Sequence, residues 1–278
     1  MYELKIRRTH KALGLTRQIV GVRFLVMQKE YDTCNAEEKN QTTICDMVRI
    51  AGSGMKVKAK ADSFFCMNAT YAVGLNKVPE AVSSGREDYQ SGRYESLAIS
   101  RQISVNKQCI PHTIYGIEIA PIECLGTADI AIAIGTAKDI MRIMQGYVKY
   151  YGLAKNVIAV ANNGVCNELI AKPFMNNDIN VSLLSACARK NGKYKSAEMG
   201  IAMPIHMLEN VLDGVLETVN LTENNKPKRE LLERLEYPEE LGFEIRMNYD
   251  YGIQASEYEK YCEECEKDLQ TEQEDKNQ

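Results

Sequence analysis

Ala128-Asp129-Ile130-Ala131-Ile132-Ala133-Ile134-Gly135 is a continuous apolar run that ends in glycine. Such a run is typical of a strand buried on both faces of a sheet. Thr136 and Asp139 follow with the spacing of a helix N-cap, and apolar residues then recur at helical spacing from Ile140 as far as Gly152. This stretch predicts a strand, a tight turn and a helix, and it places the chain in the α/β class or in a mixed α+β class.

The sequence downstream of this helix indicates further strands and helices. Residues 157–161 are apolar and predict a second strand, after which Asn162-Asn163-Gly164 turns the chain into a helix that begins near Cys166. A third strand is expected at 179–184, and Pro204 is expected to open a helix with one apolar face. This half of the body therefore alternates strands with helices.

The first half of the chain repeats this plan loosely. Strands are predicted at 19–27 and 55–61, with a helix around 45–51 between them and another helix opening near Cys66. Setting Ser63-Phe64-Phe65-Cys66 beside Asn163-Gly164-Val165-Cys166 places a strand before each cysteine and a helix after it. The comparison predicts a duplication, in which two loosely repeated strand-helix halves form one domain.

Charge separates the body from a C-terminal extension. Residues 222–278 hold 17 acidic and 8 basic side chains, whereas the whole chain of 278 residues has a formal net charge of −4, so residues 1–221 must be net positive. The polar segment 221–227 contains Pro227 and is typical of a linker. We expect a body at 1–221 and an acidic extension at 222–278 that is partly helical, partly disordered, and able to dock a protein partner or a second copy of the chain.

Several functional classes lack support in the sequence. No apolar run approaches the roughly 20 residues that span a bilayer, and the N-terminus has no secretory apolar stretch, so neither a membrane nor an extracellular location is expected and the protein is predicted to be cytoplasmic. Phosphate-loop, dinucleotide-binding and zinc-protease motifs are missing. Trp is absent and the Lys and Arg residues do not cluster with aromatics, so nucleic-acid binding is not expected.

The nine cysteines carry the most suggestive chemistry. An odd number cannot all pair within one molecule, and in a reducing cytosol cysteines act as thiols, metal ligands or redox groups. Cys262-Glu263-Glu264-Cys265 is a single C-x-x-C pair, which supplies only half of a tetrahedral zinc site, and its acidic neighbours raise thiol pKa values. We therefore interpret that pair as part of a solvated helix.

Three other cysteines, Cys45, Cys66 and Cys166, are different in kind. Cys66 and Cys166 begin helices after strands, where the helix dipole favours the thiolate form that binds soft metals. Together with Cys124 or Cys187 as a fourth ligand, the three could hold an iron–sulfur cluster or a soft transition metal. Two alternatives stay open: a nucleophilic or redox thiol in an enzyme, and a small-molecule binding module whose cysteines are structural.

The order of these features resembles a known family, domain of unknown function 169, also called ArCR. The resemblance covers roughly 13–219. It rests on Leu13-Gly14-Leu15, Val20-Gly21-Val22, Cys45, the Cys66-x-x-Ala69 and Gly74-Leu75 segment, Ala128-Asp129, Gly135, Cys166, Pro173, Asn180-Val181-Ser182-Leu183, Cys187, Arg189, and Glu198 through Pro204.

The resemblance implies a fold and a set of cysteines, but no reaction. We interpret Cys45, Cys66, Cys166 and Cys187 as metal ligands in a protein of anaerobic metabolism, and Arg189, Asn180 and Glu198 as contacts to a cofactor or ligand. Because ligands of duplicated α/β folds bind where strand ends and helix starts meet, we expect a pocket between the halves, lined by the loops of Cys66 and Cys166. Arg189 is expected to serve an anionic group of the ligand.

Overall fold

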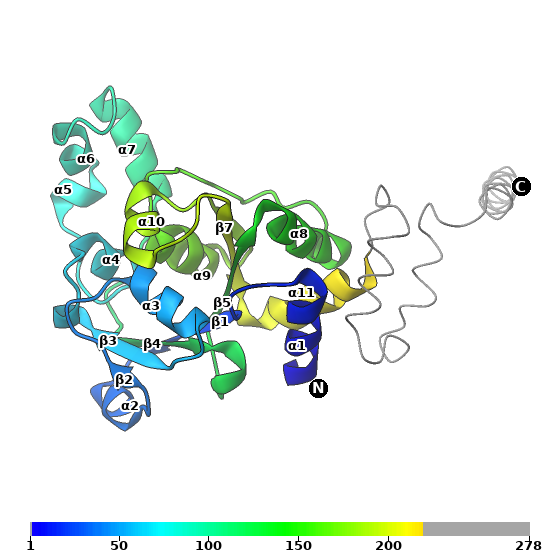
Figure 1. Ribbon diagram of the computed structural model, residues 1–278. Helices are drawn as coiled ribbons and strands as arrows, with labels where there is room; N and C mark the ends of the chain where they lie inside the picture. Colours follow the sequence, from blue (N-terminus) through cyan, green and yellow to red (C-terminus); the bar gives the residue numbers. More distant parts are fainter. Residues whose placement is uncertain (1, 219–278) are drawn as a thin grey trace, which may run out of the picture.

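The computed structural model describes residues 2–218, which form a mixed α/β body around one sheet (Figure 1). The strands are β1 (Val20–Leu25), β2 (Glu37–Glu38), β3 (Val57–Lys60), β4 (Gly116–Pro121), β5 (Ile130–Thr136), β6 (Asn180–Ser182) and β7 (Glu198–Pro204). The α-helices are α1 (Tyr2–Leu13), α2 (Gln28–Thr33), α3 (Ile44–Gly52), α4 (Met67–Ala72), α5 (Glu80–Ser83), α6 (Arg86–Gln90), α7 (Leu97–Asn106), α8 (Ala137–Tyr151), α9 (Lys172–Asn176), α10 (Ala186–Gly192) and α11 (Ile205–Glu217). Two short 3₁₀ turns, η1 (Ala61–Ser63) and η2 (Ile122–Cys124), and a π-helical segment, η3 (Cys166–Ala171), complete the order.

The sheet has an internal repeat. Its strand order in the described part of the chain is β2-β3-β4-β1-β5-β7-β6, and every neighbouring pair is antiparallel except β2 with β3. From the centre outward, the first half runs β1-β4-β3, with the two-residue β2 beyond β3 at the edge, and the second half runs β5-β7-β6. When β2 is set aside, the first strand of each half is central, the third is next to it and the second is outermost. The predicted duplication is therefore present in the topology, and both halves share one continuous sheet.

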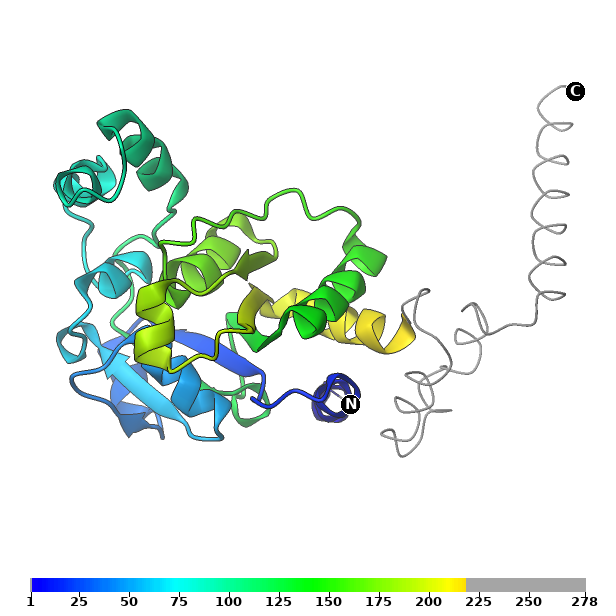
Figure 2. The ribbon, with the colours of Figure 1, turned by 45° about the horizontal axis from the view of Figure 1, so that its top comes forward.

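Alternation along the central strands divides the core into two layers. On β5, Ile130, Ile132 and Ile134 pack with α3, α4 and η3, while Ala131 and Ala133 pack with α8 and α11 on the opposite face. Successive side chains of a strand point to opposite faces of the sheet, so a strand that is apolar on both faces needs a layer of helices on each side. Helices α1, α8 and α11 form one layer, and the helices that begin near the cysteines belong to the other (Figures 1 and 2).

Helices α8 and α11 approach each other at two glycines. A Cβ built on Gly146 would lie 2.4 Å from the backbone oxygen of Val211, and one built on Gly214 would lie 2.3 Å from the oxygen of Gly146. These distances leave no room for a side chain, because real Cβ contacts are longer than 3.0 Å. The absence of side chains at both positions lets the two helices cover their face of the sheet.

Most predicted elements are confirmed, including the strand and capped helix at the start of the second half. Thr136 accepts a hydrogen bond from the backbone N–H of Asp139, and the Asp139 carboxylate accepts one in return from the N–H of Thr136 at 2.7 Å. The strand predicted at 157–161 is wrong: this segment has no regular secondary structure and belongs to no strand of the sheet. Its hydrogen bonds go to side chains instead, since the Ile158 N–H donates to Asn180 and the Val160 N–H donates to Glu168, each at 2.8 Å.

The comparison of Cys66 with Cys166 is also corrected by the fold. Cys45 lies on α3, before β3, and Cys166 lies on η3, before β6, so the two occupy equivalent places. Cys66 follows β3 at the start of α4, and Cys187 follows β6 at the start of α10. The equivalent pairs are therefore Cys45 with Cys166 and Cys66 with Cys187, because position relative to the sheet defines the repeat.

Among residues 2–218, no helix has the length and apolar composition needed to cross a membrane. The boundary at 221/222, the acidic extension and the Cys262-x-x-Cys265 pair lie outside the described residues. The roles predicted for them stay predictions.

Candidate functional site

A cavity of about 150 Å³ lies between the two halves, and five cysteines line it: Cys45, Cys66, Cys109, Cys166 and Cys187. The first half supplies three of them and the second half supplies two. All seven cysteines of the described residues are free thiols. Cys124, the other predicted fourth ligand, is exposed and does not line this cavity, whereas Cys187 does.

Four of these cysteines are held at the starts of helices. Cys45 is the second residue of α3, whose N-cap Thr43 accepts a hydrogen bond from the Asp46 N–H at 3.1 Å. Cys66 is itself the N-cap residue of α4, and Cys166 is the first residue of η3. Cys187 is the second residue of α10, whose N-cap Ser185 accepts from the Ala188 N–H at 3.3 Å.

The internal repeat relates these four cysteines in two pairs. Cys45 and Cys66 are 21 residues apart, and so are Cys166 and Cys187. Each pair spans helical structure, then β3 or β6, and the start of the next helix. Equal spacing around equivalent elements means that the two halves present their cysteines to the cavity in the same way.

Cys45 and Cys166 come together beside Gly164. A Cβ built on Gly164 would lie 3.7 Å from the Cys166 Sγ and 3.8 Å from the Cys45 Sγ, so both sulfur atoms face one small region. Both cysteines are buried. Burial raises the pKa of the Cys45 thiol to about 12, although the Val165 N–H partly offsets the effect.

Burial is also the main reason that the other thiols resist ionisation. It raises the pKa of Cys166 well above its usual value, and nearby thiolates at Cys45 and Cys66 would raise it further. The pKa values of Cys66 and Cys109 are raised by burial as well. In the metal-free protein these four thiols are therefore neutral near pH 7, because thiols ionise only near and above their pKa.

A buried polar network anchors η3, the segment that carries Cys166. Glu168 is completely buried, and its carboxylate accepts hydrogen bonds from the Ser182 hydroxyl and from the Val160 N–H. The Asn180 amide donates to the backbone oxygen of Glu168 at 2.7 Å. Lys172, four residues further along the chain, is also buried, and its ammonium donates a hydrogen bond to the Asn106 carbonyl at 2.6 Å. This network ties η3 to β6, and π-helical segments of this kind are frequent at functional sites.

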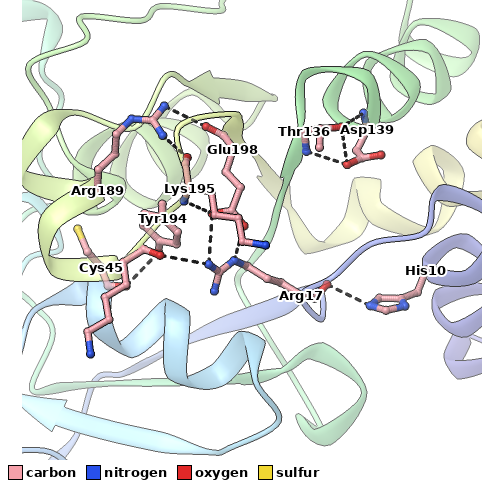
Figure 3. Close-up of polar contacts among 10 residues, drawn as sticks. His10, Arg17, Cys45, Thr136, Asp139, Arg189, Tyr194, Lys195 and Glu198 are labelled. Carbon is pink, nitrogen blue, oxygen red and sulfur yellow. Dashed lines mark hydrogen bonds and ion pairs between the residues drawn. The ribbon is translucent and has the colours of Figure 1, made fainter.

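The three residues predicted to contact a ligand do not line the cavity: Arg189, Asn180 and Glu198. The Arg189 guanidinium donates to the backbone oxygens of Leu183, Lys195 and Glu198. The Glu198 carboxylate pairs with Arg17 at 2.7 Å, and that pairing lowers the pKa of Glu198 against the opposing effect of burial (Figure 3). Their roles as ligand contacts stay predictions, and in this structure all three join segments of the chain.

Tyr194 connects the Arg17–Glu198 ion pair to the backbone of Cys45. The Tyr194 hydroxyl donates to the backbone oxygen of Cys45 at 2.9 Å, and the Arg17 guanidinium lies 5.3 Å from the centre of the Tyr194 ring (Figure 3). Arg17 also pairs with Glu198 on β7, whereas Cys45 is on α3 of the first half. The contact between halves therefore includes the start of the helix that carries Cys45.

Sequence patterns did not indicate the cavity's polar residues. Arg93 and Lys107 line it, as do Asn163 and Asn167, whose side chains are buried and bonded to each other at 3.2 Å. Asn163 was predicted only as part of a turn, and no motif marks the others. The equal spacing of the two cysteine pairs is the signal that does identify Cys187 as a member of the site.

Sulfur donors from four helix starts are a donor set suited to soft metals. Within residues 2–218, no three His, Cys, Asp or Glu side chains are already placed around a common point as ligands of one ion. In a tetrahedral thiolate site the sulfurs lie about 2.3 Å from the metal. Binding would therefore require the thiol side chains to rotate toward one another.

Comparison with known proteins identifies the family. The sequence profile of the family described as Uncharacterised ArCR, domain of unknown function 169, matches residues 9–214. Neither curated proteins nor solved structures give a match. The matched segment covers both halves of the sheet and all five cysteines of the cavity. This chain belongs to the ArCR family.

Proposed function

We propose that this protein binds a thiophilic metal group, an iron–sulfur cluster or a soft transition metal ion, in the cavity between its halves. The ligands are Cys45, Cys66, Cys166 and Cys187. One observation carries the proposal: four cysteines that are distant in sequence, in two equivalent pairs, line a single cavity.

Structural cysteines explain this arrangement less well. A buried cysteine that serves only as a small apolar residue needs no second cysteine beside it. Here the Cys45 and Cys166 sulfurs lie next to the same glycine, and the partly exposed Cys66 and exposed Cys187 line the same cavity. A metal gives a reason for grouping them, because soft metals prefer several thiolate ligands.

The raised thiol pKa values agree better with a metal site than with a nucleophile. A nucleophilic cysteine works as a thiolate and is usually found where its pKa is depressed. Burial instead raises the pKa of Cys45 and Cys166. A bound cation reverses this preference, because coordination deprotonates a thiol outright, and each ligand then releases its proton to solvent.

The proposal is tested by the metal content of protein purified without oxygen. We expect metal in a fixed ratio to protein, and the visible absorption of an iron–sulfur cluster if iron is the metal. Single replacements of Cys45, Cys66, Cys166 and Cys187 by Ser should each lower the retained metal by at least tenfold, since loss of supporting groups alone costs 10–100-fold in affinity. Cys124→Ser is the matched control, because Cys124 lies outside the cavity.

The proposal fails if folded wild-type protein neither retains metal nor takes it up when supplied with ferrous iron and sulfide, or with zinc. It also fails if Cys124→Ser loses as much metal as the four cavity variants. Far-ultraviolet circular dichroism of each variant separates loss of metal from loss of fold.

A further inference from the structure

We propose that the same cavity binds a small oxyanion, recognised by Arg93 and Lys107. This inference goes beyond the metal site and does not depend on it, because the cations do not need the thiols to be metallated. It rests on the charge of the cavity and on an insertion that breaks the internal repeat.

The cations come from a segment present in only one half. Between α4 and β4 the first half contains α5, α6 and α7, which form a lobe at one end of the body (Figure 2). In the second half the chain passes from α10, which ends at Gly192, to β7, which begins at Glu198, without such a segment. Arg93 lies between α6 and α7, and Lys107 is the C-cap residue of α7. The insertion thus adds positive charge to a cavity otherwise built by the repeat.

Both cations share a single carboxylate. The Arg93 guanidinium is 2.5 Å from one oxygen of Asp88, and the Lys107 ammonium contacts the other oxygen. Asp88 is buried, while the Arg93 side chain is 39% exposed. Two positive charges on one negative charge leave an excess of one, and both cations keep hydrogen-bond donors for a further partner, since Arg has five and Lys has three.

Nothing else in the cavity wall cancels that excess. Among the described residues, no aspartate or glutamate lines the cavity. Amides supply most of the remaining polarity: Asn68, Asn162, Asn163, Asn167 and Asn191. In a chain whose formal net charge is −4, this cavity is locally positive.

One of these amides joins the cations to the cysteines. The Asn167 side chain donates to the backbone oxygens of Lys107 and Gln108, each at 3.0 Å, and Asn167 directly follows Cys166 on η3. Lys107 is therefore positioned by the same segment that carries a predicted metal ligand. An anion held by Arg93 and Lys107 would lie in the cavity with the thiols.

The size of the cavity limits the anion. A cavity of about 150 Å³ is small beside the roughly 300–1,000 Å³ of typical ligand pockets, so it favours a small anion such as inorganic phosphate or a short carboxylate. The planar guanidinium of arginine can donate two parallel hydrogen bonds to a phosphate or a carboxylate. Such charge-assisted hydrogen bonds are stronger than those between neutral groups.

The test uses the full chain, metal-free and reduced with dithiothreitol, so that it is independent of metal binding. Isothermal titration calorimetry measures the binding of two probes, inorganic phosphate and oxalate, which distinguish a phosphoryl ligand from a carboxylate ligand. We expect saturable one-to-one binding of at least one probe. Arg93→Gln and Lys107→Gln should each weaken it about tenfold or more, the usual effect of losing one charge-assisted hydrogen bond.

Two further variants separate this site from general charge effects. Arg86→Gln removes an exposed cation of the same insertion that lies outside the cavity, and it should leave the affinity unchanged. Asp88→Asn removes the competing carboxylate and should tighten binding. The inference is overturned if neither probe binds saturably to folded wild-type protein, or if Arg93→Gln and Lys107→Gln bind the probes as tightly as Arg86→Gln does.

Discussion

The sulfur atoms of Cys45 and Cys166 face the same side of Gly164, each within 4 Å of the position that a Cβ would take there. The two residues belong to opposite halves of the chain, yet they occupy equivalent places in the internal repeat. A duplicated half that carries two cysteines therefore produces a cavity with two pairs of thiols. This relationship underlies the predictions that follow.

Gly164→Ala should reduce metal uptake without destabilising the fold. Gly164 does not have a positive φ, and the added methyl would meet both sulfurs at ordinary contact distances, so stability should stay within about 1 kcal/mol of wild type. The methyl would nevertheless occupy space into which the thiols must rotate. Metal content and urea unfolding measure the two effects, with Gly126→Ala, which meets no atoms, as the control. Full metal uptake by Gly164→Ala would count against a metal at this position.

Removing the Cys45 thiol should make the free energy of unfolding fall less steeply as the pH rises above 9. The folded-state pKa of this thiol is about 12, above its usual 9.0, so the folded protein holds the proton more tightly than the unfolded chain does. Its contribution is full below pH 9 and is lost as the pH rises toward 12, by about 1.4 kcal/mol per pH unit. Urea unfolding of metal-free protein at about pH 8 and pH 10.5 should show a steeper decline for wild type than for Cys45→Ala. Parallel declines would mean that the thiol titrates normally.

Tyr194→Phe should weaken the contact between halves beside Cys45. The change removes a buried hydrogen bond of 2.9 Å to the Cys45 oxygen and leaves the ring in place beside Arg17. A typical loss is about 1 kcal/mol in the free energy of unfolding. Tyr89→Phe, at an exposed ring, is the control and should cost little. Equal stability of the two variants would show that the Tyr194 hydrogen bond contributes nothing measurable.

Replacing Arg189 separates a structural role from the ligand role predicted from the family. Its guanidinium bonds three backbone oxygens, a pattern that the ammonium of lysine cannot reproduce. We expect Arg189→Lys and Arg189→Gln each to lower the free energy of unfolding by about 1–3 kcal/mol, with phosphate and oxalate affinity unchanged. If Arg189→Lys is as stable as wild type while Arg189→Gln loses oxyanion binding, the residue serves a ligand instead.

The sequence predicts the central elements well where local patterns agree with the fold. The strand from Ile130 and the helix capped by Thr136 combine an apolar run, a capping box and a helical stripe, and all three appear in the structure. The residues 157–161 have the same apolar character but no strand partner, because Asn180 and Glu168 satisfy their N–H groups. Strands β4 and β7 were not predicted, although β7 contains the Glu198 to Pro204 segment shared with the family.

The candidate site was predicted in part. Predicted helix starts and the resemblance to the family pointed to four cysteines, and all four line one cavity in the structure: Cys45, Cys66, Cys166 and Cys187. The repeat that relates them was matched to the wrong cysteines, because a strand was predicted directly before Cys166, where the structure has none. Arg93 and Lys107 could not be predicted, since they reach the cavity through an insertion whose packing no local pattern encodes.

X-ray absorption spectroscopy of the metal-loaded protein tests the metal site most directly. The account predicts sulfur neighbours at about 2.3 Å, with four protein thiolates as ligands. In Cys187→Ser one of these sulfurs should be replaced by a lighter oxygen or nitrogen neighbour, and Cys66→Ser should give the same change because the two residues are equivalent in the repeat. A metal surrounded only by oxygen and nitrogen atoms, or a spectrum unaltered in both variants, would contradict the account.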